Sequence, residues 1–216
     1  MERWSSERYP PAPWRLQGTS VQALRLIDSS AARGLVPHGL RVVSVWPRKT
    51  LAVLYCASYE PPSVLRYREL VFAPALVAAG GRVGFWISHI YVDDPVSLAG
   101  GRSIWGLPKA LATFEWQPQQ REVAVHSEGQ ALCRIRWGSG QLSGRGGLSV
   151  PIPLYLPVIS RSAAGFQFFS GRGSLSVARL SGEIVIEPGS PLAGLALEES
   201  HTLIAGRSLR LRVDAP

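Results

Sequence analysis

The chain has 216 residues, of which 46% are hydrophobic and only 18% are charged, so it can bury a core and is not a disordered chain. Its formal net charge is +8, but the basic residues are scattered, and no RRM, zinc-finger or helix-turn-helix signature is present, which argues against nucleic acid as a partner. We therefore expect one soluble domain over residues 1–216, with a basic balance that favours small anionic ligands.

The cysteines and the lengths of the apolar segments predict the cellular compartment of the protein. Cys56 and Cys133 each lie among apolar residues, which is typical of buried free thiols in a reducing compartment. The N-terminus lacks the apolar core of a signal peptide, and the longest apolar run, over 70–81, is short for a bilayer and contains Pro74. We expect a cytoplasmic protein with no membrane partner.

In chain order, the first expected elements are irregular or short. Residues 1–18 are polar and then proline-rich, which predicts an extended arm that docks by Trp14. Residues 19–27 predict a strand or a short helix. Residues 29–36 begin with two serines that could cap a helix and end before a proline, so they predict a short helix.

The rest of the chain predicts strands. The segments are rich in β-branched and aromatic residues and are separated by turn-forming residues such as Gly, Pro and Asp. They cover 41–46, 50–59, 65–77, 82–94, 111–117, 122–128, 131–138, 174–187 and 208–214. This pattern predicts a mainly β (α+β) fold with few short helices, built as an antiparallel barrel or sandwich.

Two segments between these strands are unusual in composition. The glycine-rich segment 138–147 lacks the GK[ST] ending of a phosphate loop and predicts a hairpin or surface loop. The segment 149–160 carries three prolines among apolar residues, so it cannot be a central strand throughout, and we expect an edge or pocket-lining segment.

Metal chemistry finds no support in the sequence. The four histidines lie far apart and show neither HxH nor HExxH spacing, and no CxxC is present. We expect no metal site and no cofactor.

The segment 100–116 carries the strongest chemical signal. The chain has 21 arginines and only two lysines, and one of these, Lys109, follows Pro108 in this segment. We expect a tight turn at Gly100 and Gly101, an irregular loop, and Lys109 at the start of the strand over 111–117. Its apolar neighbours leave two alternatives, a side chain that extends to the surface and one that is held in a pocket.

A pocket would change the chemistry of this lysine. A free lysine amine has a pKa of about 10.4, so only about one in a thousand is neutral and nucleophilic at pH 7. Lowering the pKa by three units requires roughly 4 kcal/mol, which desolvation or a nearby cation can supply. A neutral lysine can attack a ketone and form a Schiff base that serves as an electron sink.

The segment GGRSIWGLPKALA is similar to the active-site segment of the acetoacetate decarboxylase family, roughly GRE-x-x-G-x-PKK-L. The upstream IYVDDPVSLAGGR, the Tyr-x-Glu of YRELV and the LVPHGL over 35–40 also resemble that family, most specifically within 67–113. The resemblance implies an acetoacetate decarboxylase-like antiparallel barrel or cone-like sheet and a homo-oligomer.

The resemblance also implies roles for individual residues. Lys109 falls on the Schiff-base lysine and Glu69 on an active-site glutamate, although a solvent-facing Glu69 paired with Arg66 or Arg68 is the alternative. Arg102 falls on the arginine of GRE, where a structural role stays open. The candidate substrate-binding residues are Arg15, Tyr67, His89, Arg102 and Trp105.

Four departures from the family pattern affect the expected chemistry. The family's second lysine is Ala110 here, so a cation worth roughly 4 kcal/mol at about 4 Å is missing. A second active-site glutamate falls on Leu54, the substrate-binding arginine falls near Gly18, and the glutamate of GRE is Ser103. Lys109 would need activation by desolvation, as under Trp105, or by an arginine from elsewhere.

Two functions follow. The first is a lyase that acts on a small keto acid or related carbonyl compound through a Schiff base on Lys109, with Glu69 moving protons in decarboxylation, aldol or dehydration steps. The alternative is a non-catalytic protein that binds a small apolar or anionic ligand on the same scaffold, with Lys109 as a charge contact.

Overall fold

Strands dominate the chain, as the sequence predicts. The computed structural model describes residues 9–138, 151–193 and 202–216. In chain order the elements are β1 (Trp14–Asp28), α1 (Ser29–Arg33), β2 (Arg41–Val42), β3 (Lys49–Tyr59), β4 (Tyr67–Ala73), β5 (Ala75–Ala79), β6 (Arg82–Trp86), β7 (His89–Val92), α2 (Pro95–Trp105), β8 (Lys109–Leu111), β9 (Thr113–Gln117), β10 (Glu122–Ser127), β11 (Gln130–Trp137), β12 (Pro151–Ser162), β13 (Gly165–Ile186) and β14 (Thr202–Val213).

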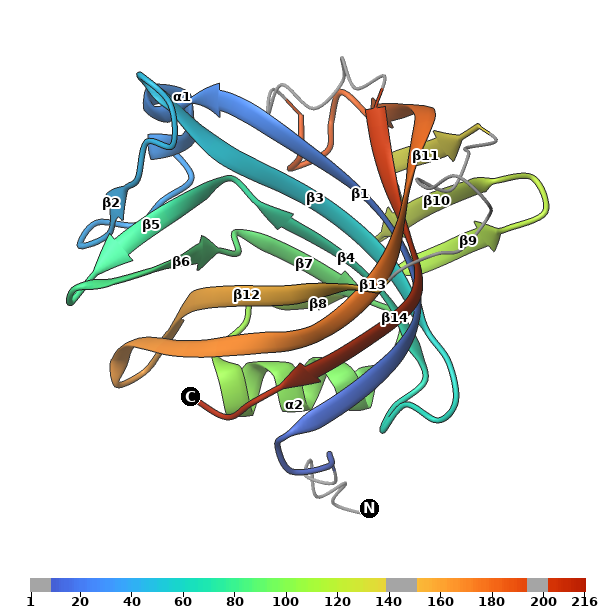
Figure 1. Ribbon diagram of the computed structural model, residues 1–216, viewed down its shortest axis with the longest axis horizontal. Helices are drawn as coiled ribbons and strands as arrows, with labels where there is room; N and C mark the ends of the chain where they lie inside the picture. Colours follow the sequence, from blue (N-terminus) through green and yellow to red (C-terminus); the bar gives the residue numbers. More distant parts are fainter. Residues whose placement is uncertain (1–8, 139–150, 194–201) are drawn as a thin grey trace.

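The strands form one hydrogen-bonded path in the order β2-β5-β6-β12-β13-β14-β1-β3-β4-β7-β8. Near its own C-terminal end, the long β13 separates from β14 and pairs with β11. The pairing then continues from β11 to β10 and from β10 to β9, on one side of the molecule (Figure 1). Among the described strands, β2 and β8 end the path without pairing to each other. The sheet is therefore open, and the predicted antiparallel barrel or cone-like sheet is not confirmed; the pairs of β6 with β12 and of β7 with β8 are also parallel.

The start of the chain differs from the expected arm. β1 begins at Trp14 and pairs with β3 and β14, so residues 14–18 belong to the sheet, and 19–27 continue as strand, not helix. Trp14 is buried, as expected for a docking side chain, and its indole N–H donates to the Pro10 carbonyl at 2.8 Å. Residues 1–8 lie outside the described residues.

Several expected strands and the first helix are shorter than the sequence predicts. The segment 65–77 divides into β4 and β5 at Pro74, which has no N–H to donate to a ladder. The segment 82–94 likewise divides into β6 and β7, and only two residues of 41–46 pair as β2. The helix expected over 29–36 ends as α1 at Arg33.

The proline-rich segment behaves as an edge strand along most of its length. β12 pairs with β13 throughout, but on its other side it pairs with β6 only at Val158 and Ile159. Among the described strands, the first half of β12 therefore has one unpaired edge, as expected for a strand that contains prolines. The expected loop over 138–147 lies outside the described residues from residue 139 onward.

Helix α2 replaces the turn that the sequence predicts at Gly100 and Gly101. The Asp94 side chain caps its N-terminus by accepting from the Ser97 amide, and Gly106 ends it with φ 59°, in the left-handed region. Gly100 is needed for close packing, because a Cβ there would lie 2.6 Å from the Trp14 ring. Figure 1 shows α2 beside β8, below the sheet.

The core consists of two clusters of buried residues. The larger includes Leu54, Phe72 and Ile135, and the smaller lies around Tyr59 and Tyr67. Both cysteines are buried and free, as predicted, and burial raises the pKa of both thiols. Within the described ranges, no helix is both long enough and apolar enough to cross a bilayer.

Candidate active site

Lys109 is the first residue of β8 and is only 3% exposed. Its strand pairs in parallel with β7, where Ile90 is its partner, and the Arg102 Nε donates to the Lys109 carbonyl at 2.8 Å. The segment between α2 and Lys109, which includes Leu107, is irregular, as the sequence predicts. The backbone of Lys109 is therefore held from both the sheet and the helix, and its side chain lies in the protein interior and not at the surface.

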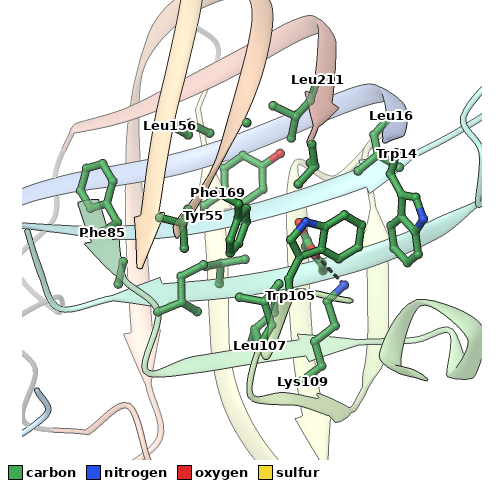
Figure 2. Close-up of a pocket in the computed structure, with 18 of the residues that line it drawn as sticks. Trp14, Leu16, Tyr55, Phe85, Trp105, Leu107, Lys109, Leu156, Phe169 and Leu211 are labelled. Carbon is green, nitrogen blue, oxygen red and sulfur yellow. Dashed lines mark ion pairs between the residues drawn. The ribbon is translucent and has the colours of Figure 1, made fainter. Parts of the chain in front are cut away.

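The Lys109 amine contacts a small set of polar and aromatic groups. Nζ donates to the Ser97 Oγ at 2.8 Å and lies 3.5 Å from the Glu69 Oε2 (Figure 2). It also lies 4.9 Å from the centre of the Tyr67 ring and 5.7 Å from that of Trp14. Aromatic faces attract a protonated amine, so both rings stabilise the charged form of Lys109.

The stem of Lys109 depends on the second glycine of α2. A Cβ at Gly101 would lie 2.5 Å from both Cδ and Cε of Lys109, which real Cβ atoms essentially never approach. The glycine therefore lets the lysine side chain cross directly over the helix to reach Ser97.

Burial lowers the pKa of the Lys109 amine below its ordinary value, and this desolvation outweighs the carboxylates of Glu69 and Asp94, which raise it. Desolvation, one of the two routes that the sequence left open, is thus the main cause of the lowered pKa. Ala110 packs against the larger core cluster on the other face of β8. A lysine at that position would point away from Lys109.

Glu69 faces the interior and is 8% exposed, so the alternative of a solvent-facing residue is wrong. Its Oε1 accepts from the Tyr59 hydroxyl at 2.8 Å, and the Tyr59 and Tyr55 hydroxyls lie 2.9 Å apart. The two arginines expected as partners pair elsewhere, Arg66 with Glu60 and Arg68 with Asp93. One Glu69 oxygen is therefore oriented by a phenol and the other faces the lysine.

A cavity of about 160 Å³ opens beside the lysine and the glutamate. Its walls are mainly aromatic and aliphatic, including Phe85, Leu156 and Phe169. Among the described residues that line it, Lys109 and Glu69 are the only charged side chains. In Figure 2 the Lys109 amine lies at one end, near Trp14 and Trp105, and Phe85 and Leu156 lie at the other.

Of the five candidate substrate-binding residues, two line this cavity. Tyr67 packs beside the Lys109 amine, and Trp105 packs edge-on against Trp14, with ring centroids 4.8 Å apart. The Trp105 indole N–H donates to the Asp214 carbonyl at 2.7 Å, so the ring presents its carbon atoms to the cavity.

Three other candidates lie outside the cavity, and strand geometry explains two of them. Side chains alternate across a strand, so Arg15 points to solvent between two cavity-facing neighbours. His89 likewise lies on the face opposite Ile90; its Nδ1 lies 3.0 Å from the Ser88 Oγ, and burial lowers its pKa. Arg102 bonds the Lys109 backbone and has the structural role that the sequence left open.

Sequence reasoning missed three residues of the site, Tyr55, Tyr59 and Ser97. The second family glutamate falls on Leu54, but Leu54 lies in the core, and the neighbouring Tyr55 faces the cavity. Ser97 follows Asp94 and Pro95, a helix-start pattern that could have placed it in the first turn of α2. No sequence signal identifies the two tyrosines.

Restoring the family's second lysine should not activate this site. We expect Ala110→Lys to reduce the free energy of unfolding by about 1–3 kcal/mol, because a larger, charged side chain replaces a methyl group against the core. It should not accelerate Schiff-base formation, since the new amine lies on the other face of β8. Urea unfolding and borohydride trapping measure the two effects. Leu26→Lys, on β1 at a position that is already 53% exposed and does not line the cavity, is the control.

Comparisons with known proteins agree with the sequence resemblance. The model of the acetoacetate decarboxylase family matches residues 1–153. The chain is 29% identical over 102 residues to Protein NEOXANTHIN-DEFICIENT 1 of Oryza sativa subsp. japonica, covering 47% of this chain and 33% of that protein. It is 30% identical over 110 residues to acetoacetate decarboxylase of Ralstonia nicotianae, covering 50% of this chain and 42% of that protein. The matched segments thus span less than half the length of either relative.

Solved structures resemble the whole described fold. Acetoacetate decarboxylase from Legionella pneumophila superposes with a TM-score of 0.66 at 14% identity, covering 100% of this chain and 91% of that one. The enduracididine biosynthesis enzyme MppR gives 0.61 at 16% identity, covering 98% and 88%. An acetoacetate decarboxylase-like enzyme from Sphingomonas wittichii RW1 gives 0.56 at 16% identity, covering 95% and 94%. At these identities the likeness is one of fold.

Proposed function

Because this chain belongs to the acetoacetate decarboxylase family, we propose that it acts as a lyase on a small keto acid or related carbonyl compound through a Schiff base on Lys109. The observation that carries the proposal is the Lys109 amine itself. It is buried at the end of an apolar cavity, and desolvation lowers its pKa, so a larger fraction is neutral and nucleophilic than for a lysine in water.

The chemistry follows from the two charged groups. The neutral amine attacks the carbonyl carbon, and water leaves as the C=N bond forms. The protonated imine then accepts the electron pair of a broken bond, either a C–C bond as carbon dioxide departs or an α C–H bond as Glu69 takes the proton. In the C–H branch Glu69 returns this proton to the enamine carbon, whereas after loss of carbon dioxide it transfers a proton taken up from water. Water then hydrolyses the imine and frees the Lys109 amine. The Glu69 Oε2, 3.5 Å from Nζ, is placed for these transfers.

Borohydride trapping tests the proposal directly. The protein is incubated with acetoacetate, acetopyruvate or pyruvate, reduced, digested and mapped by mass spectrometry. We expect the reduced adduct on Lys109 and none on Lys49, which is partly exposed and pairs with Asp28 at 3.2 Å. Lys49 is the only other lysine of the chain and serves as an internal control. Absence of a Lys109 adduct with every carbonyl compound across neutral pH would refute the proposal.

Glu69→Gln should separate the effect of Glu69 on the Lys109 pKa from its role as a base. Its negative charge raises the pKa of Lys109, so removing the charge lowers that pKa and moves the pH profile of adduct formation to lower pH. Without the base, exchange of the α-hydrogens of acetone in deuterated water, followed by NMR, should fall about 10²-fold.

The matched control for this variant is Glu60→Gln, which removes a carboxylate that pairs with Arg66 on the surface. We expect its pH profile and its exchange rate to match those of the unchanged protein. A Glu69→Gln profile that stays in place, or that moves to higher pH, would contradict the assigned role.

The second candidate function is binding without catalysis. The ion pair between Lys109 and Glu69 favours it, because the carboxylate stabilises the protonated, unreactive amine. A ligand that binds in the cavity and protects the protein against thermal unfolding, with no adduct and no α-hydrogen exchange, would support this alternative.

We also propose the homo-oligomer that the family resemblance implies. Sedimentation velocity distinguishes it from a monomer of 23.4 kDa.

A further inference from the structure

The cavity wall indicates the chemical class of the compound that reaches Lys109. Apart from Lys109 and Glu69, the polar groups among the described lining residues are three tyrosines and two indoles. Both indole N–H groups are already bonded to backbone carbonyls, and the Tyr59 hydroxyl donates to Glu69. The polar atoms are therefore gathered around the amine, and the remaining wall offers only carbon surface.

The charges of the cavity disfavour an anionic substrate. Lys109 and Glu69 together are neutral, and no arginine or histidine is among the described residues of the wall. A substrate carboxylate would lose its water and share one nitrogen cation with the Glu69 carboxylate. Buried charge without a full partner is strongly unfavourable.

The size and shape favour an apolar substituent on the carbonyl group. The volume of about 160 Å³ is close to that of the apolar cavity of about 150 Å³ that holds benzene in a well-studied protein. Figure 2 shows Phe85 and Leu156 at the end of the cavity away from the Lys109 amine. A carbonyl carbon held at Nζ would thus direct its substituent along aromatic and aliphatic side chains.

From this arrangement we propose that the substrate is a neutral ketone or aldehyde with an apolar substituent of about six to eight heavy atoms, and not a short keto acid. The inference rests on the proposed Schiff base at Lys109 and names the class of carbonyl compound that forms it. Such a compound has no carboxylate to lose. Water leaves as the protonated imine forms, Glu69 removes an α-proton, and the C–H electron pair moves toward the imine nitrogen to give the enamine. Glu69 then returns a proton to the α-carbon, and water hydrolyses the imine to release the carbonyl compound.

A series of methyl ketones tests the substrate class. Rates of borohydride-trapped adduct on Lys109 are measured for 2-butanone, 2-hexanone and 2-octanone. Each added methylene should raise the rate per unit concentration about fourfold at low ketone concentration, through burial against the wall. 2-Hexanone should also react at least about tenfold faster than 4-oxopentanoate, a keto acid of similar size, because only the acid brings a second carboxylate.

Two tryptophan variants locate the effect in the cavity. Leu156→Trp fills the end away from Lys109, so the ratio of the 2-octanone rate to the 2-butanone rate should fall at least about tenfold, more than one methylene is worth. Tyr155→Trp is the matched control, because the adjacent Tyr155 is 62% exposed and does not line the cavity. Its ratio should equal that of the unchanged protein.

The outcomes separate this inference from the proposed function. If keto acids form the Lys109 adduct as fast as neutral ketones, or chain length has no effect, the substrate class is wrong while the Schiff base stands. If Leu156→Trp and Tyr155→Trp change the ratio equally, the substituent does not occupy the cavity, and the inference fails. If no carbonyl compound forms an adduct, the proposed function fails.

Discussion

Lys109→Met abolishes the borohydride-trapped adduct and lowers α-hydrogen exchange by about 10³-fold or more, since no other residue at the site can form the imine. Methionine is also long and unbranched, so it can fill the same channel over Gly101 without a nucleophile. Mass spectrometry and NMR exchange measure the loss, and far-UV circular dichroism verifies that the variant is folded.

Two further variants make this result specific. Lys109→Arg keeps a cation for Glu69 but cannot form a Schiff base, so it should be equally inactive. Lys49→Met removes the only other lysine, which lies at the surface end of β3, and should leave both rates unchanged. Substantial exchange by Lys109→Met would show that the chemistry does not pass through this amine.

Gly101→Ala is expected to lower the rate of adduct formation about 10²-fold, although position 101 does not line the cavity. The new Cβ would lie 2.5 Å from the stem of Lys109, so the stem or the helix must shift, and the amine moves with it. A displacement of about 1 Å at a reacting atom is enough for a loss of this size. Overpacking costs about 1–3 kcal/mol, partly offset by about 1 kcal/mol of helix propensity, so the stability change should be small.

Gly34→Ala is the control for this substitution. Gly34 has an ordinary helical φ of −63°, and the nearest atom to its added Cβ is 4.0 Å away. We expect its adduct rate to stay at the level of the unchanged protein, with unfolding measured in urea for both variants. A Gly101→Ala protein with the full adduct rate would show that the lysine does not depend on this close approach.

The predicted site residues that line the cavity are those carried by short, specific segments. Lys109 and Trp105 lie within one such segment, and Tyr67 and Glu69 within another, so their relation along the chain is enough to identify them. Their meeting in space follows from β4 and β8 both pairing with β7.

The positions that the sequence associated with the site but that lie outside the cavity depend on which face of a strand they occupy. Arg15 and His89 each lie next to cavity-facing residues, and Leu54 lies next to Tyr55. A displacement of one residue in a strand moves a side chain to the opposite face, and the sequence alone does not settle which face meets the cavity when both faces are apolar. Here both faces of β3 are covered, so alternation of polar and apolar residues gives no signal.

The missed helix has a different cause. Gly100 and Gly101 lower helix propensity, which favours a turn on local grounds. Both glycines are needed for tertiary contacts, because Gly100 makes room for the Trp14 ring and Gly101 for the Lys109 side chain. Trp14 is distant in sequence and Lys109 lies beyond the end of the helix, so local sequence does not indicate either contact. The Asp94 cap and the left-handed Gly106 were the readable signals of this helix.

The pairing of the first strand with the last has a consequence for how the protein is made. On the ribosome, Trp14 and Leu16 are synthesised early, but their partners Val213 and Leu211 emerge nearly two hundred residues later. Contacts of such long sequence separation are slow to form. The same late segment supplies the Asp214 carbonyl that fixes the Trp105 indole. The chamber around Lys109 is therefore completed only after Asp214 has been synthesised, and until then its apolar walls are available to chaperones.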